Sequence, residues 1–189
     1  MRVGILGGSF NPAHVGHISL ARRALKSLNL DQIWLMVSPQ NPFKPSKGMA
    51  PFAERLASAK KLADGRKIIA TDIEQRFGTK KTFLTVQHLQ KHFPKISFTW
   101  LIGADNLPDL CHWYRGRDLI QKIPIAVCAR PGCNKEALKS SSASWMRRWQ
   151  RPEYKAGTLG EKGAPDWVFL HGREVDLSST EIRKLALEK

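Results

Sequence analysis

The sequence predicts an α/β protein with a doubly wound, mostly parallel sheet flanked by helices. Three observations predict this fold class. Apolar runs of strand length alternate with segments of helical period along the chain, and the first run leads into two glycines and a helix start. The length of 189 residues, 42% of them hydrophobic, suits one domain with a substantial core. We therefore expect a single domain over residues 1–189.

The expected strands are short apolar runs. They lie at residues 2–6, 32–37, 67–70, 96–102, 124–129 and 167–170. Because these runs alternate with helical segments, we expect parallel strands with helices on both faces of the sheet. Ligands of such sheets bind at the carboxyl ends of the strands, near the point where the strand order reverses.

The expected helices are amphipathic. In residues 15–28 the apolar side chains recur at helical spacing, and residues 51–63 begin with a proline, which is tolerated in the first turn. A third helix over 82–93 ends before Pro94, and a last one begins at Ser178, where Glu181 gives capping-box spacing.

Two segments lack any such pattern, and we expect both to be loops. Residues 38–50 contain three prolines and two lysines. Residues 131–165 are long, polar and rich in Ser, Gly, Arg and Lys. A loop of the second length is more often functional or mobile than part of a core.

Composition narrows the class of protein. The net charge of +15 and pI of about 10.1 indicate attraction to polyanions, either nucleic acid or phosphorylated small molecules.

The three cysteines are odd in number and irregularly spaced, so we expect reduced thiols and no metal ligands. We find no signal peptide and no apolar run of ~18 residues. We therefore expect a cytoplasmic protein without membrane contact.

Residues 7–17, Gly-Gly-Ser-Phe-Asn-Pro-Ala-His-Val-Gly-His, form the first chemical motif. The glycines let the backbone turn close to a ligand, and the following helix start offers N–H groups that suit phosphate. His14 and His17 are three residues apart, so they share one face of the first helical turn. Incidental histidines and a metal site are the alternatives, although two histidines without a third ligand make a weak metal site.

A second motif, Ser178-Ser179-Thr180-Glu181-Ile182-Arg183, again enters a helix. Arg183 lies about one turn in, where its guanidinium can hold phosphate in a bidentate fork. Taken alone, the hydroxyl run is equally well explained as a helix cap.

Together the two motifs resemble the HxGH-type nucleotidyltransferase superfamily. Residues 38–44, Gly103-Ala104-Asp105-Asn106-Leu107 with Trp113, and Arg130-Pro131-Gly132 are similar to its pyridine-nucleotide branch, the nicotinate-nucleotide adenylyltransferases. The resemblance implies a Rossmann-like nucleotidyltransferase fold. It also implies adenylyl transfer from ATP to nicotinate mononucleotide, giving nicotinate adenine dinucleotide and pyrophosphate in NAD biosynthesis. Mg²⁺ is expected to bind mainly through the ATP phosphates.

The resemblance also assigns residue roles. Phosphate binding and transition-state stabilisation fall to His14, His17, Lys44 and Arg183. The ATP-binding positions are Gly7, Gly8, Ser9, Phe10, Gly103, Asp105, Arg130, Ser178, Ser179 and Thr180. The acceptor nucleotide is expected at Thr82, Thr85 and Trp113. No protein ligand of a metal is expected.

The chain departs from the family pattern near the acceptor positions. The family's Tyr-Thr-x-Asp-Thr segment here has Lys81 and Leu84 in place of the aromatic and the acid. An adenylyltransferase that prefers nicotinamide mononucleotide or another phosphate acceptor is therefore one alternative. A basic nucleic-acid-binding protein is a remote one, motivated by the charge and by residues 145–149, Trp-Met-Arg-Arg-Trp. We expect no nucleic-acid partner, and the residues leave a homo-oligomer open.

Overall fold

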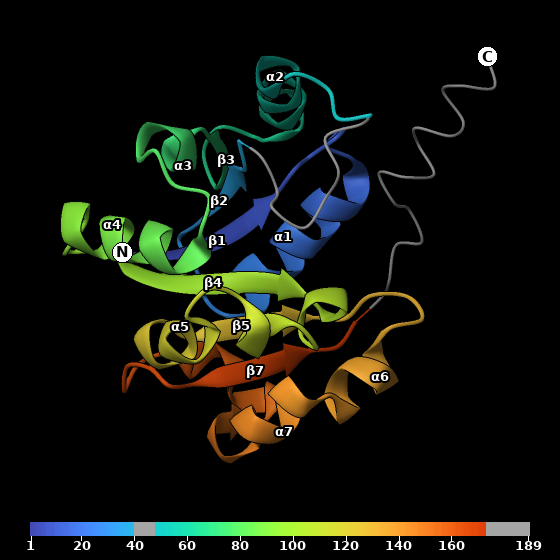
Figure 1. The fold of residues 1–189 in the computed structure, drawn as a ribbon, viewed down its shortest axis with the longest axis vertical. Coiled ribbons are helices and arrows are strands. Elements are labelled where there is room, and N and C mark those ends of the chain that lie inside the picture. Colours follow the sequence, from blue (N-terminus) through green and yellow to red (C-terminus); the bar gives the residue numbers. More distant parts are fainter. Residues whose placement is uncertain (40–47, 173–189) are drawn as a thin grey trace.

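The computed structural model describes residues 1–39 and 48–172 (Figure 1). Its strands are β1 (Arg2–Gly8), β2 (Gln32–Val37), β3 (Ile68–Thr71), β4 (Ser97–Gly103), β5 (Ile125–Cys128), β6 (Gln150–Arg151) and β7 (Trp167–Leu170). In this described part the seven strands form one sheet in the order β3-β2-β1-β4-β5-β7-β6, and all the neighbouring pairs are parallel. The predicted fold class is confirmed.

Helices cover both faces of this sheet (Figure 1). They are α1 (Val15–Ser27), α2 (Phe52–Leu62), α3 (Ile73–Arg76), α4 (Thr82–His92), α5 (Gly116–Lys122), α6 (Asn134–Lys139) and α7 (Ser141–Met146). Short 3-10 helices follow: η1 (Ala104–Asn106), η2 (Leu110–His112), η3 (Arg147–Trp149) and η4 (Glu153–Thr158). Apolar side chains of α1 and α2 belong to one buried cluster, and those of α4, α5, α6 and α7 belong to the other.

The strand order reverses between β1 and β4. From β1 the chain moves outward through β2 to β3, and it then returns to the other side of β1 as β4. The segments after β1 and β4 therefore diverge toward opposite faces, which opens a crevice at the carboxyl ends of these two strands. Leu6 pairs with Leu101, so both strands end at nearly the same level.

Most predicted elements are found within one or two residues of their expected bounds. The predicted strands 32–37 and 167–170 match β2 and β7, and the predicted helix 82–93 is α4. Gly7 and Gly8 differ from expectation, because they do not follow the first strand but extend it, opposite Met36 and Val37.

The expectation of a loop over residues 131–165 is wrong. This segment contains α6, α7, η3, β6 and η4. Buried Ala137, Ala143 and Met146 attach the two helices to the core, and the Ser140 side chain accepts a hydrogen bond from the Ala143 N–H at the start of α7. Two helices of six residues each are too short to produce a visible helical period in a polar sequence.

The predictions for the proline-rich loop, the terminal helix, the cysteines and the membrane have the following outcomes. The predicted loop 38–50 lies largely outside the described residues, as does the terminal helix expected from Ser178. The three cysteines are free thiols, and burial raises the pKa of Cys128 to about 11. Among the described residues, we find no helix with the length and apolar character to cross a bilayer.

Candidate active site

Two histidines build the start of α1. His14 is the N-cap residue, and its Nδ1 accepts a hydrogen bond from the Gly16 N–H at 3.2 Å. His17 reaches back, and its Nδ1 accepts from the His14 N–H, also at 3.2 Å. The two rings are in contact, with centroids 3.9 Å apart. The predicted pairing of these imidazoles at a helix N-terminus is therefore found, in the form of a capping box.

These hydrogen bonds define which ring nitrogen carries the proton. A nitrogen that accepts a hydrogen bond has no proton of its own, so in both rings the proton is on Nε2. Each ring then offers Nε2–H as a donor, next to the partial positive charge of the helix N-terminus. The His14 side chain is 6% exposed, so its Nε2–H lies in a largely dry environment, where a hydrogen bond to an anion is stronger than in water.

The end of β1 leads into this helix through a tight backbone turn. Gly7 is exposed although β1 is a central strand, so the sheet is open to ligand at this point. Phe10 has a φ of +47°, and its buried ring packs against His17 with centroids 4.8 Å apart. A Cβ at Gly8 would lie 3.2 Å from the Phe10 ring, closer than most side chains pack, so a larger residue there would have to displace that ring slightly.

The sequence analysis did not single out Arg55, whose buried side chain hydrogen-bonds to the backbone of this turn. Arg55 is 2% exposed, and burial lowers the pKa of its guanidinium. It donates to four backbone carbonyls, those of Ser9 at 2.7 Å, Ser38 at 2.8 Å, Pro39 at 2.9 Å and Ala50 at 3.0 Å. It thus joins the ends of β1 and β2 to the start of α2.

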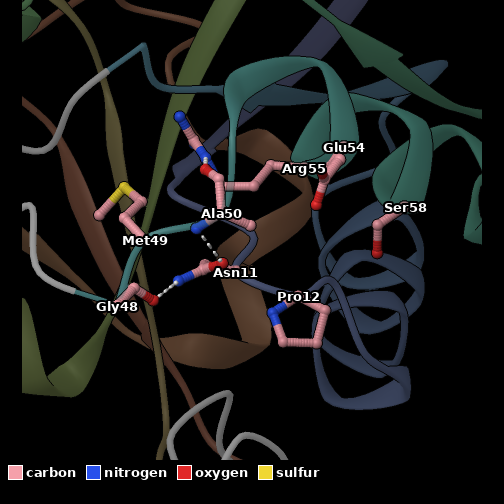
Figure 2. A pocket seen from close by; sticks show the side chains of 8 residues that line it. All are labelled: Asn11, Pro12, Gly48, Met49, Ala50, Glu54, Arg55 and Ser58. Atoms are coloured by element: carbon pink, nitrogen blue, oxygen red, sulfur yellow. Dashed lines mark hydrogen bonds between the residues drawn. The ribbon is translucent and has the colours of Figure 1, made fainter.

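Asn11 adds a second connection between the same segments. Its Nδ2 donates to the Gly48 carbonyl at 3.0 Å, and its Oδ1 accepts from the Ala50 N–H at 3.1 Å (Figure 2). A cavity of about 570 Å³ lies beside these bonds, lined by Asn11, Pro12, Gly48, Met49, Ala50, Glu54, Arg55 and Ser58 (Figure 2).

A second group of predicted residues gathers at the ends of β4 and β5. The Arg130 Nε lies 3.2 Å from an Asp105 carboxylate oxygen, and both side chains are partly exposed. Gly103, the last residue of β4, lies against this ion pair, because a Cβ there would lie 2.5 Å from the Arg130 Nε. The structure therefore brings these three predicted ATP-binding residues together, and their contact with nucleotide stays a prediction.

The predicted acceptor residues lie around the start of α4. Thr82 is its first residue and is half-buried, whereas Thr85 is fully buried. The Thr85 hydroxyl donates to the Glu74 carboxylate at 3.0 Å and lies 3.2 Å from the Lys81 carbonyl. Trp113 is the C-cap residue of η2, and its half-buried side chain packs against the larger core cluster.

Four predicted positions of the second motif, Ser178, Ser179, Thr180 and Arg183, lie outside the described residues, as does Lys44. The described part of the chain therefore contributes N–H groups, imidazoles and arginines, which are donors to anions. A cluster of three or more His, Cys, Asp or Glu side chains suited to a metal ion is not present within 1–39 and 48–172.

The parallel sheet and the imidazole-capped helix at its reversal point define a nucleotidyltransferase, and the model of the cytidylyltransferase-like family matches residues 5–185. A protein of Gluconobacter oxydans described as a probable nicotinate-nucleotide adenylyltransferase is 54% identical, over 97% of this chain and 94% of its own. One of Gluconacetobacter diazotrophicus with the same description is 48% identical, over 100% and 87%. The chain belongs to the nicotinate-nucleotide adenylyltransferase family.

Solved structures share the fold. A Plasmodium falciparum nicotinic acid mononucleotide adenylyltransferase complexed with NaAD superimposes with a TM-score of 0.69 at 18% identity, over 97% of this chain and 82% of that one. The same enzyme complexed with APC gives a TM-score of 0.67 at 18% identity and equal coverage.

Proposed function

We propose that this protein transfers the adenylyl group of ATP to the phosphate of nicotinate mononucleotide, releasing pyrophosphate and forming nicotinate adenine dinucleotide. The observation that carries the proposal is the pair of imidazoles, His14 and His17, that cap α1 at the reversal point of the sheet. The family relationship identifies the pyridine nucleotide as the acceptor class.

The reaction needs positioning and charge stabilisation more than proton transfer. The attacking phosphate oxygen is anionic at neutral pH, so no general base is required. The barrier comes from bringing two polyanions together and from the charge that develops on the leaving pyrophosphate. The Nε2–H donors of His14 and His17 and the N–H groups of the first α1 turn supply this stabilisation.

The other predicted residues complete the site in this proposal. Gly7 to Phe10 line the phosphate end, and Gly103, Asp105 and Arg130 hold the adenosine. Lys44, Ser178, Ser179, Thr180 and Arg183 contribute further phosphate donors. Thr82 and Trp113 form the acceptor side, with the pyridine ring of the acceptor stacked on Trp113. Thr85, which is fully buried, supports that side through its hydrogen bond to Glu74.

Mg²⁺ enters in this proposal as part of the MgATP substrate. This ion keeps several waters and binds through substrate phosphates. The donor set fits that role, because the described groups at the site bind phosphate oxygens rather than the cation, and Asp105 is already paired with Arg130.

The test is product formation with MgATP and each of two acceptors, nicotinate mononucleotide and nicotinamide mononucleotide. We expect the acid to be converted in preference to the amide. His17→Ala should lower kcat by about 10²- to 10³-fold, as for the loss of one donor to a developing charge. His92→Ala, at the far end of α4, is the matched control and should retain activity. Near-normal turnover of a folded His17→Ala protein would contradict the phosphate-site assignment.

A further inference from the structure

Two cation–aromatic pairs form a surface cluster between the start of α4 and the start of α5. The Lys81 Nζ lies 4.0 Å from the centroid of the Tyr114 ring, and the Arg115 guanidinium carbon lies 4.3 Å from that of Phe83. The Phe83 and Tyr114 rings meet edge to face at 6.5 Å. We call these four residues the α4–α5 rim.

The rim lies at the ligand-binding end of the sheet. Helices α4 and α5 each precede a strand of the parallel sheet, β4 and β5, so both begin at the carboxyl edge where the phosphate turn also lies. Tyr114 is 48% exposed. Lys81, whose ammonium lies on the Tyr114 ring, is the N-cap residue of α4 and directly precedes Thr82, so the rim borders the predicted acceptor side at the start of that helix.

The two cations of the rim differ in their partners. The Arg115 Nε is bonded to the Asp118 carboxylate at 2.6 Å, which compensates its charge. For Lys81 the structure gives no carboxylate partner among residues 1–39 and 48–172, and its ammonium rests on an aromatic face. Lys81 therefore contributes the uncompensated positive charge of the rim.

The backbone of Lys81 is held firmly, whereas its side chain is exposed. The Lys81 N–H donates to the Thr79 hydroxyl at 3.1 Å, and the Lys81 carbonyl accepts from the Thr85 N–H, also at 3.1 Å. Both threonines are buried. The Lys81 side chain thus extends from a backbone held in one position, and its ammonium lies over the Tyr114 ring.

We infer that Lys81 is a specificity-determining residue, which selects an acceptor whose aromatic ring carries a carboxylate over one whose ring carries a neutral amide. This inference rests on the proposed function, which puts the acceptor ring at Trp113. A ring stacked there would bring its substituent toward the rim, where the ammonium attracts a carboxylate and gains little from an amide.

The experiment compares kcat/KM for nicotinate mononucleotide and nicotinamide mononucleotide with MgATP. In Lys81→Gln we expect kcat/KM for the acid to fall about tenfold through KM, and that for the amide to stay constant. Lys81→Arg keeps the charge and should keep the acid preference. Lys80→Gln is the matched control, since it removes the neighbouring cation, and should leave the ratio within about twofold.

The outcomes separate the inference from the proposed function. An acid-to-amide ratio that is unchanged in a folded Lys81→Gln protein overturns the role of Lys81 while the function stands. An equal fall of the acid-to-amide ratio in Lys80→Gln overturns it too, because the ratio would then depend on the total positive charge of this surface and not on Lys81. A wild-type protein that converts both acceptors equally also overturns it, and conversion of neither refutes the proposed function itself.

Discussion

Glu74 is a carboxyl group that the fold buries behind the acceptor side. It is 4% exposed, and burial raises its pKa above the ordinary 4.5, although hydrogen bonds from Thr85 and Ser38 act in the opposite direction. The folded protein therefore holds this proton more tightly than the unfolded chain does. The group's contribution to stability is complete below pH 4.5 and is lost as the pH rises through the raised pKa.

Glu74→Gln should stabilise the protein at neutral pH, because the amide has no charge to desolvate and its oxygen can still accept from Thr85. We expect the melting temperature at pH 7 to rise by about 2 to 4 °C and that at pH 4 to change less. Glu54→Gln, on the exposed first turn of α2, is the control and should shift neither value. A lower melting temperature at pH 7 would mean that the buried carboxylate is stabilised in its charged form.

Arg55 acts at the scale of elements, because one side chain joins the ends of β1, β2 and the start of α2. Arg55→Met would leave four carbonyls without this donor, at a cost of about 3 kcal/mol in the free energy of unfolding. Urea denaturation measures that cost. Arg55→Lys should recover part of it, since one ammonium cannot reach all the carbonyls.

Arg66→Met removes an exposed arginine of similar size and is the control for Arg55. It should change the free energy of unfolding by less than about 0.5 kcal/mol. If Arg55→Met lowered the free energy of unfolding by no more than this control does, water would be donating to the four carbonyls in place of the missing guanidinium. The arginine would then not be what holds the turn after β1.

The strands were predictable because parallel strands buried on both faces are near-continuous apolar runs, as β2, β5 and β7 are. The short helices α6 and α7 were not, since one and a half turns carry too few apolar positions to show a period. At the site, the two glycines and two histidines could be recognised because their spacing in the sequence is typical of a phosphate-binding turn. A single arginine on an amphipathic helix has no such pattern. The role of Arg55 was therefore visible only in the three-dimensional structure.

The charge of the whole molecule acts on both substrates. A net charge of +15 attracts ATP and a mononucleotide from solution, and such attraction weakens as salt screens it. Raising the ionic strength from 0.1 M to 1 M shortens the Debye length from about 10 Å to about 3 Å.

We therefore expect kcat/KM for ATP to fall several-fold over this range of KCl, mainly through KM, with kcat nearly constant. Steady-state kinetics at matched viscosity, with sucrose as the uncharged control, measure this. A salt-independent KM would mean that local contacts in the site, rather than the field of the whole protein, determine ATP binding.

The hydrogen bonds of His14 and His17 have a consequence for acid solutions. Each Nδ1 must accept a backbone N–H for the first turn of α1 to close. A proton on either Nδ1 would replace an acceptor by a donor that faces another donor, so the ring would no longer cap the helix. The capping box and the Nε2–H donors aimed at phosphate therefore both require the same neutral tautomer. Loss of the cap would be observed as faster amide exchange of His14 and Gly16, whose N–H groups the two rings hold.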